Sequence, residues 1–428
     1  MIRKGGATAL KSMGDAPKLL SRLGEVWRQD FTIFRNDEGV PASHRLAFLD
    51  SAASAQKPET VLEAMAAALE GPYANIHRGL YHNSAEMTTR FEDARKVISG
   101  FLGAPINGTI FTRNSTEGIN LVAQTWGRAN LKKGDAVLLT QLEHHANIVP
   151  WQLLQAEKGF EIGVADITDD GALDMVSIKK HFADGKVKLA AFTAMSNVLG
   201  VKPDVAVLTQ LAHAAGAKVL LDATQAVVHG PFNFTATGAD FAVCTGHKLY
   251  GPTGIGVLIG KPELLATMPP YQGGGDMIET VSFKGTTYAP PPARFEAGTP
   301  AFIEAMGLAA SIQYMQKIGW KDIQKHESSM AAYLDAALDD AMVLRYGMAG
   351  RGNGIAAFNL PKCHPADVAT LLNQHNVAVR SGHHCAMPLM AKLNIDGCLR
   401  ASIGLYTVKD DIDQLVAGLH KAAKLLRK

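Results

Sequence analysis

The chain has 428 residues, which is more than one compact core usually holds, so two domains are expected. Hydrophobic residues make up 47% of the chain and charged residues 19%, a balance that excludes a disordered or fibrous protein. The formal net charge of +2 gives no reason to expect nucleic acid or an acidic membrane as a partner, and no apolar run reaches the ~18 residues of a membrane span.

The first 45 residues form a mildly basic N-terminal extension that we expect to pack on the smaller domain. Leu19, Leu23 and Trp27 recur at helical spacing and predict a short amphipathic helix. The extension lacks the apolar stretch of a secretory signal, and its acidic residues disfavour a cleaved transit peptide, although organellar targeting stays open. The four cysteines form no CxxC pair and no disulfide framework, which indicates a reducing compartment such as the cytoplasm.

Residues 46–310 alternate short apolar runs with helical segments. Strands that are apolar along their whole length indicate a mostly parallel sheet covered on both faces, and such sheets bind ligands at the carboxyl ends of their strands. The pattern therefore predicts a large ligand-binding domain. The candidate strands are residues 109–112, 136–140, 189–193, 218–221, 241–244 and 256–259, with candidate helices at 118–126 and 205–213.

A stretch rich in glycine and proline follows the last of these strands, and it includes glycines 273–275 and prolines 290–292. Its length and irregular pattern indicate a functional loop or an arm between subunits. Residues 311–428 have the pattern of a smaller α+β domain. The predicted fold class is therefore α/β, with a large domain on a mostly parallel sheet and a smaller C-terminal domain.

Lys248 is the first candidate for catalysis. It follows the apolar run 241–244 and precedes a glycine-rich turn, where a ligand could approach closely. Partial desolvation would lower the pKa of such a lysine below its usual ~10.4 and favour the neutral, nucleophilic amine. Asp222 ends another apolar run and could keep a pyridine nitrogen protonated, with Gln225 three residues later on the same side. A helix N-cap is the alternative role for Asp222.

Other polar groups also follow strand ends. Ser115 and Thr116 open a helix, where hydroxyls and free backbone N–H groups can hold a phosphate, with simple capping as the alternative. His144 follows the run 136–140, and its imidazole could stack on a pyridine ring or transfer a proton, or form an ordinary loop hydrogen bond. No third ligand accompanies the pair His144-His145, so no metal site is predicted.

In this order the groups resemble those of the pyridoxal-phosphate enzymes of fold type I, and within them the class V aminotransferase family. The chain is most similar to the SufS-type (group II) cysteine desulfurases, from about Leu46 to the C-terminus. The resemblance also rests on the runs Leu49-Asp50-Ser51-Ala52-Ala53-Ser54, His77-Arg78-Gly79, Ser196-Asn197-Val198-Leu199-Gly200, Arg294-Phe295-Glu296-Ala297-Gly298-Thr299-Pro300 and Arg380-Ser381-Gly382-His383-His384-Cys385.

The resemblance implies a role for each candidate. Lys248 would bind pyridoxal phosphate covalently, with Asp222 on the ring nitrogen and His144 stacked on the ring as a catalytic group. Gln225 would hydrogen-bond the ring oxygen, with Asn197 close by. The phosphate would be held by Ser115, Thr116, Thr245, His247 and, from the second subunit of a homodimer, Thr299. The substrate would be bound by Arg400, Arg78, Asn197 and Arg380, with Arg400 clamping its carboxylate.

Cys385 lies in a glycine-containing loop of the second domain. Arg380, His383 and His384 could lower the pKa of its thiol and make it nucleophilic, whereas a buried apolar cysteine is the usual alternative. The resemblance implies conversion of L-cysteine to L-alanine, with a persulfide on Cys385 passed to a SufE- or SufU-like acceptor for iron–sulfur cluster assembly. Selenocysteine lyase and cysteine-sulfinate desulfinase activities stay open, and a non-catalytic assembly scaffold is a further alternative.

The chain departs from the usual residues of this family in two neighbouring places. Tyr81 stands where a histidine is usual, and Asn83 where a leucine is usual. Both come shortly after Arg78, so the loop that follows Arg78 is where we expect this chain to differ from the family. Thr245 stands where a serine is usual, and it keeps the hydroxyl that a phosphate site needs.

Overall fold

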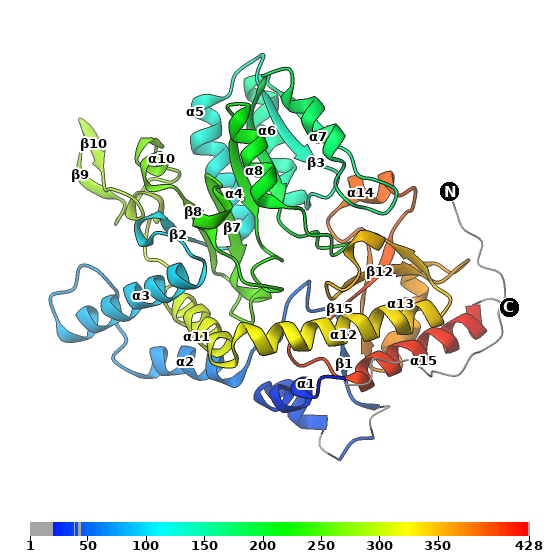
Figure 1. The fold of residues 1–428 in the computed structure, drawn as a ribbon. Helices are drawn as coiled ribbons and strands as arrows, with labels where there is room; N and C mark the ends of the chain where they lie inside the picture. The colour runs from blue at the N-terminus through cyan, green and yellow to red at the C-terminus, as the bar shows by residue number, and fades with distance from the viewer. Residues whose placement is uncertain (1–19, 38, 42–43, 427–428) are drawn as a thin grey trace.

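The structure is a computed structural model, and it describes residues 20–37, 39–41 and 44–426 (Figure 1). The first 19 residues of the predicted N-terminal extension, with part of its predicted amphipathic helix, lie outside the described residues. Among the described residues, no helix has the length and apolar character that crossing a bilayer needs. The α/β fold class with a mostly parallel sheet is confirmed, as the strand pairing below shows.

A seven-stranded sheet forms the centre of the large domain, in the strand order β2-β8-β7-β6-β5-β3-β4. Strand β8 runs antiparallel to both of its neighbours, and the other pairs of the sheet are parallel. The strands are β2 (Thr109–Thr112), β3 (Ala136–Thr140), β4 (Glu161–Ala165), β5 (Val187–Thr193), β6 (Lys218–Asp222), β7 (Phe241–Thr245) and β8 (Gly256–Gly260).

Apolar clusters cover both faces of this sheet. Successive side chains of a strand point to opposite faces, so each strand contributes residues to both clusters. In β6, Val219 and Leu221 pack into one apolar cluster, while Leu220 packs into the cluster on the other face. This explains why the strands are apolar along their whole length. The helices of the large domain include α2 (Glu59–Glu70), α3 (His82–Phe101), α4 (Ser115–Val122), α6 (Val149–Lys158), α7 (Met175–Phe182), α8 (Val205–Ala214) and α11 (Phe302–Ile318).

The C-terminal part of the chain forms a second, antiparallel sheet in the order β11-β12-β15-β14. The short strand β1 (Ala47–Phe48) pairs in parallel with β13 (Val377–Ala378), so the chain passes through this part before it enters the large domain. The elements are α12 (Trp320–Asp340), β11 (Leu344–Tyr346), β12 (Ile355–Asn359), α13 (Pro365–Asn373), β14 (Arg380–Gly382), α14 (Met387–Lys392), β15 (Cys398–Ser402) and α15 (Lys409–Leu426).

The predicted division at residue 310 lies inside α11, which continues to Ile318. Gly319, with φ +86°, separates α11 from α12, and this left-handed backbone angle suits glycine. The division into residues 46–310 and 311–428 therefore stays a prediction.

The glycine- and proline-rich stretch contains a regular hairpin that the sequence pattern did not predict. Strands β9 (Ile278–Ser282) and β10 (Gly285–Tyr288) pair in antiparallel fashion, and the hydroxyls of Thr280 and Thr287 lie 2.7 Å apart across the pair. The hairpin projects from the side of the large domain that is remote from the second sheet (Figure 1), and Phe283 at its tip is fully exposed. Neither strand of the hairpin has a buried face. The sequence therefore lacks the alternation of apolar and polar residues that usually indicates a half-buried strand.

The described part of the N-terminal extension contains α1 (Leu23–Trp27), which packs against the second sheet's helices. The Trp27 ring lies 5.3 Å from that of His326 in α12, and Arg28 forms an ion pair with Asp411 of α15 at 2.8 Å. Phe31 packs on Tyr406, with ring centroids 4.9 Å apart, and belongs to the apolar cluster of the large domain. The extension therefore contacts both parts of the protein.

Replacing Arg28 with methionine should lower the free energy of unfolding by about 3 kcal/mol, because it leaves the Asp411 carboxylate buried without its partner. Burial already raises the pKa of Asp411 to about 6, against the opposing pull of Arg28. Urea denaturation at neutral pH measures the loss. Arg22→Met is the matched control, since Arg22 forms an exposed ion pair at 3.8 Å and its loss should change stability by less than about 0.5 kcal/mol. Equal effects of the two substitutions would contradict a structural role for the buried pair.

Candidate functional site

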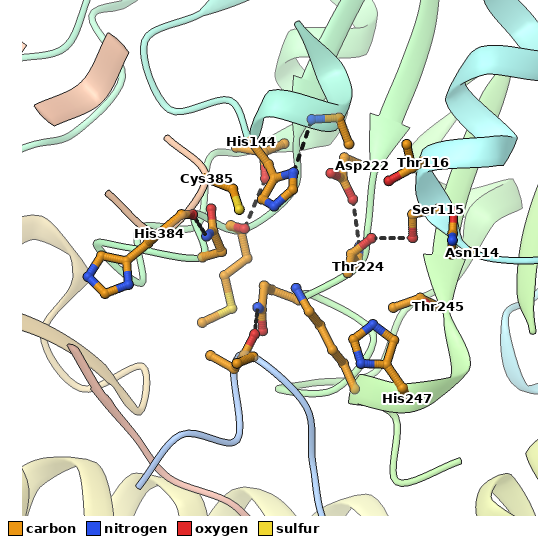
Figure 2. A pocket seen from close by; sticks show the side chains of 18 of the residues that line it. Asn114, Ser115, Thr116, His144, Asp222, Thr224, Thr245, His247, His384 and Cys385 are labelled. Carbon is orange, nitrogen blue, oxygen red and sulfur yellow. Dashed lines mark hydrogen bonds between the residues drawn. The ribbon is translucent and has the colours of Figure 1, made fainter. Parts of the chain in front are cut away.

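A cavity of about 230 Å³ lies where the strands of the large sheet end and the second sheet begins. In Figure 2, Cys385 and His384 lie on one side of it, Ser115, Thr116 and Thr245 on the other, and His144 and Asp222 between them. Most of the predicted site residues line this cavity: Ser115, Thr116, His144, Asn197, Asp222, Gln225, Thr245, His247, Lys248, Arg380, Cys385 and Arg400.

One end of the cavity has the chemistry of an anion site. Helix α4 begins at Ser115, and the Asn114 side chain caps it by accepting a hydrogen bond from Glu117 N at 2.9 Å. The first N–H groups of a helix have no partner within the helix, so they can donate to an anion. The Thr245 hydroxyl is buried here and has no hydrogen-bond partner among the described residues. Phosphate binding and capping are therefore compatible at this helix.

Thr224 was not predicted, although it links the two groups of predicted residues. Its hydroxyl lies 2.6 Å from that of Ser115, and its backbone N–H donates to Asp222 Oδ1 at 3.1 Å. Asp222 thus accepts a hydrogen bond within the turn that follows β6, where no helix begins, so it is not the helix N-cap of the alternative interpretation; it also lines the cavity. A hydroxyl that acts through two other residues leaves no pattern in the sequence.

The middle of the cavity holds the groups predicted to contact a pyridine ring. Gln225 Nε2 donates to the carbonyl of Ala52 at 2.8 Å, which leaves Gln225 Oε1 buried and without a partner among the described residues. His144 Nδ1 accepts from Ala146 N at 3.0 Å. Burial, with the charge of Lys248, lowers the pKa of His144 to about 4, so the ring is neutral at physiological pH.

Lys248 lies at the end of a short 3₁₀ turn, η7 (Gly246–Lys248), directly after β7. Burial lowers the pKa of its ammonium group to about 8, and the charge of Arg400 acts in the same direction. A Cβ atom on Gly246 would lie 2.9 Å from the Pro252 carbonyl oxygen, so only glycine permits this tight turn. The turn therefore presents a lysine that is partly neutral at physiological pH, as the sequence predicted.

The opposite wall is formed by Arg400, which is 2% exposed. Its Nη1 donates to the Asn197 carbonyl at 2.9 Å and its Nη2 to Asp50 Oδ1 at 2.9 Å, while Nε is buried without a partner among the described residues. Arg380 lies beside the same Asp50 carboxylate, at 3.1 Å. Asp50 belongs to one of the runs that carry the resemblance, but no role was predicted for it.

Besides His384 Nδ1 in the cysteine loop, three buried polar atoms of cavity-lining residues have no partner in the described part of the chain: Thr245 Oγ1, Gln225 Oε1 and Arg400 Nε. A buried polar group without a hydrogen bond is costly, so a ligand is expected to satisfy them. A phosphate fits beside the Thr245 hydroxyl and α4, and a phenolic ring hydroxyl can donate to Gln225 Oε1. A carboxylate fits Arg400. The residues present therefore fit pyridoxal phosphate together with an amino acid substrate.

Cys385 is exposed at the rim of this cavity. Both His384 (φ +51°) and Cys385 (φ +55°) have left-handed backbone angles, which are strained for residues other than glycine. Asn197 Nδ2 donates to the His384 carbonyl at 2.8 Å and helps to hold the loop. By contrast, Cys244 and Cys398 are buried, and burial raises the pKa of each thiol to about 12.

The structure corrects one part of the interpretation of the cysteine loop. His384 was expected to lend positive charge to the Cys385 thiol. Its ring is buried, with Nε2 2.8 Å from the Cys398 carbonyl, and burial together with Arg400 lowers its pKa to about 3. His384 is therefore neutral at physiological pH, and it serves to hold the loop rather than to polarise the thiol.

Two predicted residues do not line the cavity of a single chain. Arg78 is 65% exposed at its side chain and forms an ion pair with Asp276 at 3.0 Å. Thr299 lines a separate cavity of about 330 Å³, together with Arg113 and Tyr271. The residues that depart from the family, Tyr81 and Asn83, are exposed at the start of α3.

Glu143 is a second buried carboxyl near the site, and it was not predicted. It accepts hydrogen bonds from Thr140 Oγ1 at 2.6 Å, Asn147 Nδ2 at 2.7 Å and Thr193 N at 3.0 Å. Burial nevertheless raises its pKa to about 8, and the negative charge of Asp222 adds to the effect. In the sequence, only its position next to His144 indicates that Glu143 lies near the site.

This shift predicts a pH dependence of stability. A raised pKa means that folded protein holds the Glu143 proton between about pH 4.5 and pH 8 while unfolded protein has lost it, so stability falls as pH rises through this window. Glu143→Gln removes the titration. The wild type should therefore lose stability relative to this variant by at most roughly 1.4 kcal/mol per pH unit. Urea denaturation of both proteins at several pH values checks this, and parallel curves would mean that Glu143 is ionised in the folded state.

Comparison with known proteins identifies the family. The model of the aminotransferase class-V family matches residues 47–415. A cysteine desulfurase of Klebsiella pneumoniae is 47% identical over 403 residues, which cover 93% of this chain and 98% of that relative. The solved cysteine desulfurase CsdA of Escherichia coli has a TM-score of 0.84 at 35% identity, covering 94% of this chain and 99% of its own. The apo cysteine desulfurase of Thermococcus onnurineus has a TM-score of 0.88 at 36% identity, covering 96% and 100%. The chain therefore belongs to the aminotransferase class-V family and, within it, to the cysteine desulfurases, which are pyridoxal-phosphate enzymes.

Proposed function

We propose that the protein converts L-cysteine to L-alanine and keeps the released sulfur as a persulfide on Cys385. One observation carries this proposal: the exposed thiol of Cys385 lines the same cavity as Lys248 and Arg400. A plain aminotransferase needs a lysine and an arginine but no thiol at this place. The thiol therefore gives the site its particular chemistry.

The residues around the cavity would hold the cofactor in a fixed orientation. Ser115, Thr116, Thr245 and His247 would bind its phosphate, and Asp222, Gln225 and His144 would contact its ring. When bound, pyridoxal phosphate withdraws electrons from the substrate and so weakens the bonds at its Cα and Cβ atoms. Asp222 favours this withdrawal, because a carboxylate beside the ring nitrogen keeps that nitrogen protonated.

Lys248 and Arg400 would handle the substrate. Arg400 has an unpaired buried Nε and would bind the substrate carboxylate, as a guanidinium suits. Lys248, with a pKa near 8, is neutral in a sizeable fraction of molecules at physiological pH, so its Nζ can take the proton from the substrate Cα. The same Nζ, once protonated, can return a proton to the product.

Cys385, acting as a thiolate, would receive the sulfur of the substrate. Its Sγ attacks the substrate sulfur, the new S–S bond forms, and the Cβ–S bond of the substrate breaks with its electron pair left on the carbon side. A proton then completes the methyl group of alanine. The sum is cysteine plus the Cys385 thiol giving alanine plus the Cys385 persulfide, which balances without an external oxidant or reductant.

The persulfide must leave for the enzyme to turn over again, and we propose a protein thiol as its acceptor. Cys385 is exposed at the rim, so a SufE- or SufU-like partner can reach it, and iron–sulfur cluster assembly is the expected destination of the sulfur. The four cysteines are free, which suits a reducing compartment such as the cytoplasm.

The direct test is Cys385→Ala. The variant should still bind cofactor and cysteine, because Lys248, Asp222 and Arg400 are unchanged, but it should form no persulfide. Alanine release should fall by a factor of at least ~10², since a thiolate is a poor leaving group without a nucleophile to receive the sulfur. Alanine analysis and mass spectrometry of the protein measure both effects.

Cys363→Ala is the matched control for that experiment. Cys363 is also free, but it lies in a half-buried turn outside the cavity, so its loss should leave alanine release unchanged. Lys248→Ala should abolish release altogether. Turnover of cysteine by Cys385→Ala at the wild-type rate would reduce the proposal to a generic pyridoxal-phosphate lyase.

We further propose that the active protein is a homodimer in which Thr299 completes the phosphate site of the partner subunit. The position of Thr299, in a separate cavity from Lys248 within one chain, supports this arrangement. Thr299→Ala alone should lose roughly tenfold in activity, the value of one hydrogen bond to a charged group. Lys248→Ala alone should be inactive.

Mixing the two variants separates the arrangements. If Thr299 acts across the interface, a mixed dimer contains one site with both residues intact, and exchanged subunits should regain about a quarter of the wild-type activity by the symmetry of a twofold dimer. If Thr299 acts within its own chain, no site of the mixture is intact. Activity that does not rise after demonstrated subunit exchange would contradict the proposal.

A further inference from the structure

The loop that carries Cys385 is held by two groups of the large domain. Asn197 Nδ2 donates to the His384 carbonyl at 2.8 Å, and the backbone N–H of His145 donates to the Cys385 carbonyl at 2.7 Å. The two consecutive carbonyls of the strained turn are therefore bound by residues that follow β5 and β3. The position of the thiol depends on the large domain, although Cys385 belongs to the second one.

His145 makes a second contact with the same loop through its ring. Its Nε2 accepts a hydrogen bond from the backbone N–H of Met387 at 2.9 Å. Met387 is the first residue of α14, and the residue before it, Ala386, makes no side-chain cap. An N-terminal N–H of a helix needs such an acceptor, so the His145 ring, which belongs to the large domain, replaces the missing cap.

This bond requires an unprotonated Nε2, which means a neutral ring whose proton is on Nδ1. Burial lowers the pKa of His145, and the nearby His383 acts in the same direction. The neighbouring His144 ring, 6.3 Å away, is also neutral at physiological pH. The surroundings of His145 thus favour the protonation state that the contact needs.

We propose that His145 is a positioning residue, which holds the Cys385 thiol in place by binding the Cys385 carbonyl and the backbone N–H of Met387, two residues further along the loop. This role is separate from that of His144, whose ring lies against the cofactor site. The effect of His145 on catalysis rests on the proposed function. The hydrogen bonds themselves exist in the resting protein, and they can be tested there without any turnover.

The test compares His145→Leu with His145→Gln. Leucine keeps the backbone N–H and roughly the side-chain volume but removes the acceptor, whereas the glutamine Oε1 can still accept from Met387. In the leucine variant, amide hydrogen exchange of resting enzyme should rise about tenfold in peptides covering residues 383–390, from the loss of one hydrogen bond. The glutamine variant should stay within about threefold of the wild type.

His181→Leu is the matched control. The His181 ring also bonds a single backbone group, the Val164 carbonyl at 3.1 Å, but this group belongs to β4 and not to the cysteine loop, so exchange at 383–390 should not change. Persulfide formation in a single turnover should fall about tenfold in His145→Leu and recover in His145→Gln. The cofactor absorbance of the resting protein should stay that of the wild type, because no group around Lys248 is altered.

Unchanged exchange in His145→Leu, or a glutamine variant that behaves like leucine, would overturn the proposal. His145→Ala makes the same comparison if the leucine variant does not fold. Faster exchange in a protein that forms no persulfide even as wild type would support the positioning role and reject the desulfurase function. Hydrogen exchange therefore tests the positioning role of His145, and persulfide formation by the wild type tests the desulfurase function separately.

Discussion

The buried guanidinium of Arg400 is the constraint around which the site is organised. A charge that is 2% exposed must be compensated, and its compensation comes from two distant segments: Asp50, directly after β1, and the Asn197 carbonyl, after β5. Arg400 itself lies in β15. One side chain thus fixes the second sheet, the segment after β1 and the strand ends of the large sheet relative to one another, and the cavity is the space that these three leave between them.

The same arrangement explains why the cavity is polar while its surroundings are apolar. The large sheet is covered on both faces, so polar side chains can gather only where its strands stop, and Asp222, Thr245 and Thr193 all lie at such ends. Burial also affects the titratable groups beside them: it lowers the pKa of Lys248 to about 8 and, by lowering the pKa of His144, keeps that ring neutral. The cavity is surrounded by apolar residues, and a few of its buried polar groups have no hydrogen-bond partner among the described residues. Both cofactor and substrate are needed to supply those hydrogen bonds.

Much of this was predictable from the sequence, for a physical reason. Strands buried on both faces are continuous apolar runs, so β2, β3, β6, β7 and β8 were predicted to within a residue at each end. The edge strand β4, half-exposed, and the hairpin β9–β10 lack that signal and were missed. Asp50, Thr224 and Glu143 were missed because each acts through other side chains, a role that leaves no pattern in the sequence, even though Asp50 belongs to a recognisable run and Thr224 lines the cavity.

The pairing of β1 with β13 also affects how the protein can form. Asp50 and Arg380 are 330 residues apart in the chain. At the ~5–20 residues per second of protein synthesis, the ribosome therefore needs roughly 15 to 65 seconds to produce the partner after the first segment has emerged. During this time the segment around Leu49, fully buried in the finished protein, has nothing to pack on. Assembly of the active site is consequently a late event in synthesis, and a nascent chain that stops short of β13 exposes the apolar surface that Leu49 buries in the finished protein.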